Sequence, residues 1–138
     1  MGEPPSLRYL TADQVWAMNE AILLREGQAC LLRDRVALES AVARPQMAAY
    51  YQQADHITQA AALIGGIALA HAFLDGNKRT AALAGATFLR LNGYQIVDRD
   101  AAFGRTIEAL VVARGQGSAP QDAELALVQW LRAQVVPL

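Results

Sequence analysis

Cysteine is almost absent from this 138-residue sequence, which contains Cys30 and no other. A single cysteine cannot form a disulfide within the chain, so nothing indicates an oxidising compartment. The sequence also has only two histidines, His56 and His71. One thiolate and two imidazoles are too few ligands for an ordinary structural zinc site.

Long apolar runs and an excess of one charge sign are missing as well. The longest weakly polar run, residues 60–70, is too short to span a bilayer, and residues 1–8 lack a signal-peptide pattern. The 12 Lys and Arg residues nearly balance the 13 Asp and Glu residues. A general nucleic-acid binder would carry a strong basic excess. We therefore expect a cytoplasmic protein with no membrane contact and no direct nucleic-acid binding.

Hydrophobic residues and alanine are abundant. Hydrophobic residues make up 54% of the chain and charged residues 18%, which argues against disorder. Alanine is the best helix former, and it recurs along the whole sequence. The length favours one domain over residues 1–138.

Periodic apolar residues predict an all-α, compact bundle of about six helices. The expected helices cover residues 11–25, 34–44, 56–74, 78–91, 103–111 and 125–135. Thr11 and Gln14 have capping-box spacing, whereas Pro45 is expected to end the second helix. We expect a loop or irregular hairpin at 45–55, a brief extended stretch at 94–97 and a flexible connection at 115–120.

The segment His71-Ala-Phe-Leu-Asp-Gly-Asn-Lys-Arg-Thr80 crowds polar groups between two apolar helices. The first N–H groups of the second helix lack intrahelical partners, and the helix dipole favours an anion there. Lys78 and Arg79 oppose that dipole unless an anion compensates them, which hints at a bound phosphate. Asp75 is a hard ligand suited to Mg²⁺, and His71 is a candidate base for an attacking hydroxyl.

Ordinary explanations exist for each of these residues. A histidine at a helix end is more often structural, Asp-Gly-Asn is a common turn, and a Lys-Arg pair is usually a solvated surface. The spacing does not fit a P-loop, because no glycine directly precedes Lys78 and no strand leads into the segment. A helix-turn-helix DNA reader is disfavoured by the near-neutral charge.

The whole segment resembles the signature of the Fic/Doc family, and specifically its Doc (death-on-curing) branch. Residues 38–46 and 81–94 are also similar to stretches that flank this signature in the family, so the resemblance covers about residues 7–114 and weakens after 115. Fic adenylyltransferases typically carry glycine where this chain has Lys78 and arginine where it has Ala82. Both differences match the Doc branch.

The resemblance implies transfer of the terminal phosphate of ATP to a protein Ser/Thr hydroxyl, with translation elongation factor Tu as the family's target and arrest of translation as the effect. His71 would be the catalytic base, Asp75 would hold Mg²⁺, and Phe73 would anchor the motif in the core. The phosphate-binding set would comprise Gly76, Asn77, Lys78, Arg79 and Thr80. Residues 47–53 would correspond to the flap beside which the target docks.

The resemblance also implies a regulator. Many Fic proteins contain an inhibitory helix with glutamate four residues after Ser or Thr, and this sequence has no such pair. The Doc branch is instead restrained by a separate Phd-like antitoxin, so we expect such a partner in a toxin–antitoxin pair. Two alternatives remain open, an AMP-transferring Fic-type adenylyltransferase and a non-catalytic binding module.

Overall fold

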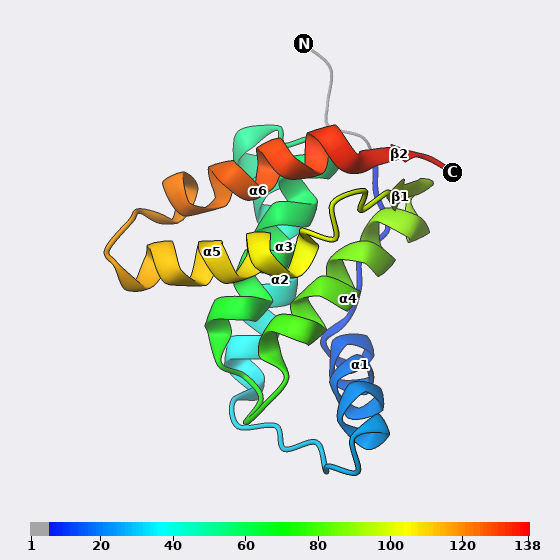
Figure 1. The fold of residues 1–138 in the computed structure, drawn as a ribbon, viewed down its shortest axis with the longest axis vertical. Coiled ribbons are helices and arrows are strands. Elements are labelled where there is room, and N and C mark those ends of the chain that lie inside the picture. Colours follow the sequence, from blue (N-terminus) through cyan, green and yellow to red (C-terminus); the bar gives the residue numbers. More distant parts are fainter. Residues whose placement is uncertain (1–5) are drawn as a thin grey trace.

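The computed structural model describes residues 6–138, which form six helices and two short strands (Figure 1). The elements are α1 (Ala12–Arg25), α2 (Arg35–Gln52), α3 (His56–Ala70), α4 (Asn77–Leu91), β1 (Tyr94–Ile96), α5 (Phe103–Gly115), α6 (Pro120–Gln134) and β2 (Val135–Pro137). The expected all-α bundle is confirmed. None of the described helices is long and apolar enough to cross a bilayer. Residues 1–5, which belong to the stretch judged to lack a signal peptide, lie outside the described residues.

Helix α3 is the central element of the bundle (Figure 1). It packs against α2, α4, α5 and α6, and most of its residues are buried. Its alanines and glycines keep the helix thin, so that neighbouring helices approach it closely. Because α3 and α4 are consecutive and packed together, the connection between them lies at one end of the core.

Local side-chain caps account for where three of the helices begin. The Thr11–Gln14 capping box is formed, with Gln14 N donating to Thr11 Oγ1 at 3.1 Å. Asp34 accepts from Ala37 N at 3.0 Å at the start of α2, and Asp55 accepts from Thr58 N at 2.9 Å at the start of α3.

Pro45 does not end α2, so the expected loop or hairpin at 45–55 is wrong. The helix continues to Gln52, and Pro45 is buried within it. A proline at this position leaves the carbonyl of Ala41 without its helical N–H partner. Gly66 of α3 packs against that carbonyl, because a Cβ on Gly66 would lie 3.2 Å from Ala41 O. Close packing between the two helices covers the unpaired carbonyl, so α2 continues through a proline that the sequence pattern alone predicts to end it.

Arg44 reinforces the same region from the neighbouring position of α2. Its guanidinium donates to Ala62 O of α3 at 2.8 Å and pairs with Glu124 of α6 at 2.7 Å. The side chain of Glu124 is only 15% exposed, so the ion pair is partly shielded from solvent. This three-helix link, together with the buried proline, outweighs the local tendency to stop.

Helix α3 and the last helix also differ from their sequence-based boundaries. Helix α3 ends at Ala70 rather than at residue 74, because His71 adopts a left-handed conformation with φ of 52°. The last helix begins at Pro120, and Val135, expected in that helix, belongs to β2 instead. Strand β2 pairs antiparallel with β1, which confirms the brief extended stretch after residue 93.

Candidate active site

The α3–α4 loop, residues 71–76, is joined to the connection between α1 and α2. Phe73 forms an antiparallel bridge with Leu32, and Leu74 N donates to Leu31 O at 2.9 Å. Arg33 N donates to Ala72 O at 2.7 Å. These backbone bonds hold the loop in an extended path beside residues 28–34 instead of leaving it free at the end of the bundle.

Phe73 and Asn77 close the loop from inside. Phe73 is fully buried in the main core, as expected of the motif's anchor. The Asn77 amide makes two hydrogen bonds to the backbone of Phe73, accepting from its N–H at 3.2 Å and donating to its carbonyl at 2.9 Å. The Asn77 side chain, expected among the phosphate-binding groups, is therefore engaged within the loop. As the first residue of α4, Asn77 can still offer an anion its backbone N–H.

His71 stands at the carboxyl end of α3, and its side chain is exposed. The left-handed backbone turns the chain at this residue away from the helix axis. A non-glycine residue in that region of φ/ψ space is uncommon and often marks a functional position. The imidazole is thus available to a molecule that approaches the loop from solvent.

The amino end of α4 has the features of an anion site. Gly76 is its N-cap residue with φ of 77°, a left-handed conformation that favours glycine. No side chain caps this helix within the described part of the chain. Thr80 N bonds Gly76 O at 2.9 Å, so the first helical bond leaves the preceding N–H groups without intrahelical acceptors. Those N–H groups and the helix dipole favour a negative charge.

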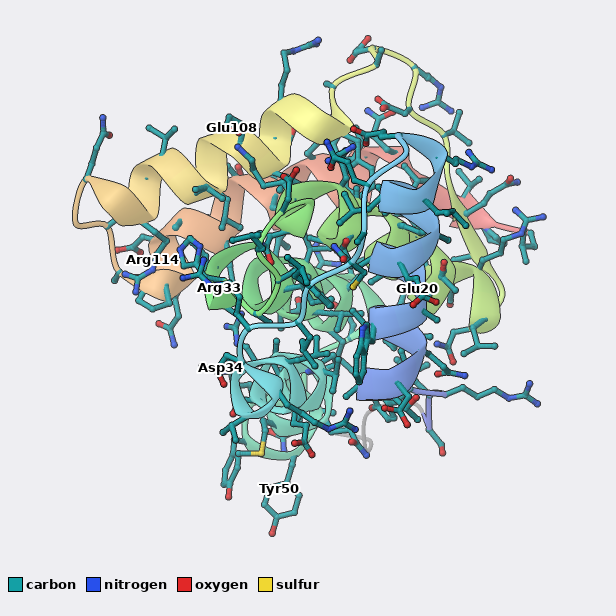
Figure 2. The ribbon with its side chains drawn as sticks, turned by 90° about the horizontal axis from the view of Figure 1, so that it is seen from below. Glu20, Arg33, Asp34, Tyr50, Glu108 and Arg114 are labelled. Atoms are coloured by element: carbon teal, nitrogen blue, oxygen red, sulfur yellow. The ribbon has the colours of Figure 1, made fainter. Side chains whose placement is uncertain are left out.

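The two cations of the motif pair with glutamates from other helices. Lys78 pairs with Glu108 of α5, and Arg79 pairs with Glu26, the C-cap residue of α1. Lys78, Arg79 and Glu108 border a pocket of about 240 Å³ between α4 and α5. Figure 2 shows Glu108 projecting from α5 at this side of the molecule. All four side chains are partly exposed, so an incoming polyanion can compete for the cations.

Asp75 is an exposed carboxylate beside this helix end. One oxygen accepts from Gly76 N at 2.7 Å and lies 3.9 Å from a nitrogen of Arg79. No group of three or more His, Cys, Asp or Glu side chains suited to a metal occurs among residues 6–138. Asp75 fits the role of a lone protein ligand to Mg²⁺, which usually keeps phosphate oxygens and waters in its remaining positions.

Thr80 is placed differently from Asp75, Lys78 and Arg79, because its side chain is completely buried. Its hydroxyl accepts from Asn19 Nδ2 at 3.0 Å, and the same amide donates to Asp75 O at 2.9 Å. Thr80 therefore supports the helix from within and presents no side-chain surface to a ligand. Asn19 was not found by sequence reasoning, and its position 56 residues before Asp75 leaves no local signal for it.

Residues 47–53, expected to be the flap, do not lie beside the motif. They form the last turns and C-cap of α2, next to the start of α3. The 15 residues of α3 separate that end from His71 by roughly 20 Å at 1.5 Å per residue. In Figure 1 the end of α2 lies at the top of the bundle, whereas the connection from α3 to α4 lies at its lower end. The non-helical segment that borders the motif is residues 28–34.

Comparisons with known proteins agree with this architecture and motif. The model of the Fic/DOC family matches residues 9–89, and the chain belongs to that family. "Toxin Doc" of Mycolicibacterium smegmatis (strain ATCC 700084 / mc(2)155) is 48% identical over 67 residues, which cover 47% of this chain and 52% of the relative. "Protein kinase doc" of Escherichia phage P1 is 30% identical over 93 residues, covering 67% of this chain and 74% of the relative. The chain thus spans about half the length of the mycobacterial toxin.

Proposed function

We propose that this protein is a Doc-like toxin that transfers the γ-phosphate of ATP to a Ser or Thr hydroxyl of a protein target. The observation that carries the proposal is the exposed His71 beside an uncapped helix end bearing Lys78, Arg79 and Asp75. A base, a metal carboxylate and an anion site are the groups that phosphoryl transfer needs. The names of the two relatives, one a toxin and one a protein kinase, support the same reading.

In the proposed reaction, His71 takes the proton of the target hydroxyl as its oxygen forms a bond to the γ-phosphorus. The bond from that phosphorus to the β–γ bridging oxygen breaks, and ADP leaves with the electron pair. Mg²⁺ held by Asp75 would neutralise charge on the phosphates when bound. The N–H groups at the start of α4, with Lys78 and Arg79, would bind the transferring phosphoryl group.

We further propose that the target segment docks along residues 28–34. This stretch pairs with the motif loop on one side, and Leu31 and Leu74 lie directly opposite each other with exposed side chains. An extended target chain beside them would bring its hydroxyl to the end of α3 that carries His71. Translation elongation factor Tu in the cytoplasm is the proposed target, and a Phd-like antitoxin is the proposed regulator.

The proposal is tested with purified protein, Mg²⁺, elongation factor Tu and ATP labelled on either the γ- or the α-phosphate. We expect label from γ-ATP alone, and we expect His71→Ala to abolish it. His56→Ala is the matched control, because His56 lies at the opposite end of the same helix and should leave transfer intact.

Three results would contradict the proposal. Label from α-ATP would identify an adenylyltransferase and show that Lys78 does not determine which phosphate is transferred. Transfer that survives His71→Ala would remove the proposed base. No transfer, together with no binding of Mg-ATP in calorimetry and no growth arrest on expression, would identify a non-catalytic binding module.

A further inference from the structure

Asn19 joins α1 to both sides of the turn that begins α4. It is completely buried, and its two amide protons go to Asp75 O at 2.9 Å and Thr80 Oγ1 at 3.0 Å. Asp75 precedes the Gly76 turn and Thr80 follows it by one helical turn, so the single amide spans the candidate anion site from beneath. Both contacts reach across more than fifty residues of sequence.

One polar atom of the Asn19 side chain is left without a partner at this buried position. The Asn19 Oδ1 atom is buried and has no hydrogen-bond partner within residues 6–138. Burying an unsatisfied acceptor costs stability. A leucine, which has the same branching of side-chain heavy atoms, would avoid that cost but would lose both donated bonds. An unpaired buried acceptor beside a candidate site is a local cost in stability, and such costs are expected where a residue serves function.

Asn19, Leu23 and the C-cap residue Glu26 face this turn from α1 and its end, at helical spacing. A Cβ on Gly76 would lie 3.1 Å from Asn19 Nδ2 and 3.3 Å from Leu23 Cδ2, so the turn is seated directly on both side chains. One turn further along α1, Glu26 pairs with Arg79. Residues 19, 23 and 26 therefore form one face of α1 that supports the start of α4.

We propose that Asn19 is a positioning residue that fixes the direction of the Asp75 carboxylate and of the first N–H groups of α4. It acts through the Asp75 carbonyl and the Thr80 hydroxyl and touches no reactant itself. Fixing both sides of the Gly76 turn keeps Asp75, the proposed metal ligand, at a constant position relative to the proposed anion-binding N–H groups. This role rests on the phosphotransferase function proposed above.

The test is Asn19→Leu, which removes both donors and keeps the branching and number of side-chain heavy atoms. We expect kcat to fall about 10- to 100-fold and the KM for Mg-ATP to rise, with the KM for the protein target unchanged. The thermal midpoint should fall, as in the control below, because the Asp75 carbonyl and the buried Thr80 hydroxyl lose their donor. Amide hydrogen exchange should quicken at residues 75–80 and remain slow in the middle of α3.

The matched control is Gln59→Met, since Gln59 is equally buried and its amide bonds Ala54 O and Tyr9 Oη away from the motif. We expect this variant to lose stability with unchanged kinetic constants. Thr80→Val gives a second probe, because it removes one acceptor and should reproduce part of the Asn19→Leu effect. If Asn19→Leu does not fold, Thr80→Val tests the positioning role in its place.

Wild-type kinetics and wild-type loop exchange in Asn19→Leu would overturn the positioning role. A lowered thermal midpoint with unchanged kinetics would overturn it too, since Asn19 would then serve stability alone. If the wild-type protein transfers no phosphate, the proposed function fails first. Exchange at residues 75–80 in the two variants then still decides whether Asn19 fixes the turn.

Discussion

Gly85 of α4 lies directly against Ile64 of α3, and a Cβ on Gly85 would be 2.4 Å from Ile64 Cγ1. Both residues are fully or almost fully buried, so Ile64 has no open space into which it can turn. The contact brings together the two helices that hold the motif loop between them. We expect Gly85→Ala to destabilise the fold by about 1–3 kcal/mol through overpacking.

Urea unfolding measures this effect, and Gly104→Ala is the control. Gly104 is also helical, but a Cβ there would meet no atom within 4 Å. Alanine at that position should stabilise by about 0.5–1 kcal/mol, because it lowers the backbone entropy lost on folding. Equal effects of the two substitutions would mean that the close approach at Gly85 does not limit stability.

Asp55 gives the fold an acid-sensitive link between α3 and α6. Burial raises the pKa of this carboxyl, but hydrogen bonds donated by Arg132 and Thr58 and the Arg132 charge outweigh it and hold the pKa at about 2. In the unfolded chain this carboxyl has its ordinary pKa of 3.8 and takes up a proton near that pH. In the folded chain it takes up the proton only near pH 2. The stabilisation is therefore complete above about pH 4 and is lost as the pH falls toward about 2.

Asp55→Asn isolates this contribution, because asparagine also caps a helix but does not titrate. Both members of the Arg132 pair are partly exposed, so solvent screening reduces the expected stability difference to about 1 kcal/mol. The free energies of unfolding of the two proteins should differ by that amount at pH 7, and the difference should shrink below about pH 4. A difference that stays constant down to pH 3 would contradict the assignment.

The Asn77 amide is expected to matter for activity more than for stability. Asn77→Ala removes both bonds to the Phe73 backbone and should lower phosphate transfer about 10- to 100-fold, because the loop loses its defined shape. Asn92→Ala is the control at the other end of α4, where the amide likewise bonds backbone groups of Arg8 and Phe88. That variant should lose about 1 kcal/mol of stability and keep its transfer rate, both measured on the same preparations.

Features encoded in a few adjacent residues could be predicted from the sequence. The Thr11 capping box sets the start of α1 within four residues, and the motif brings its polar groups together because they are contiguous. The six-helix count followed from apolar periodicity, which packing in an α-helical bundle enforces. Helix ends held by distant contacts were missed. Pro45 looks like a stop until Gly66 of α3 is seen to cover the carbonyl that it leaves unpaired.

The same distinction separates the motif residues from their supports. Asn19, Glu26 and Glu108 reach the motif from α1, its C-cap and α5, and nothing in their local sequence marks them. Thr80 carries a hydroxyl that suits a phosphate by chemistry, yet it is buried because the first turn of α4 packs on α1. Residue type predicts phosphate chemistry for the motif, whereas the fold assigns which of its members face solvent.

The bridge between Leu32 and Phe73 also bears on the order in which the chain assembles. Most helix pairs that pack closely here are neighbours in sequence, and such local contacts form early because little chain entropy is lost in closing them. The bridge joins the segment before α2 to the segment after α3, so it requires α2 and α3 to have packed against each other first. The motif loop would therefore acquire its shape only once the α2–α3 pair has docked, so a partly folded chain without that pair would lack the proposed phosphate site.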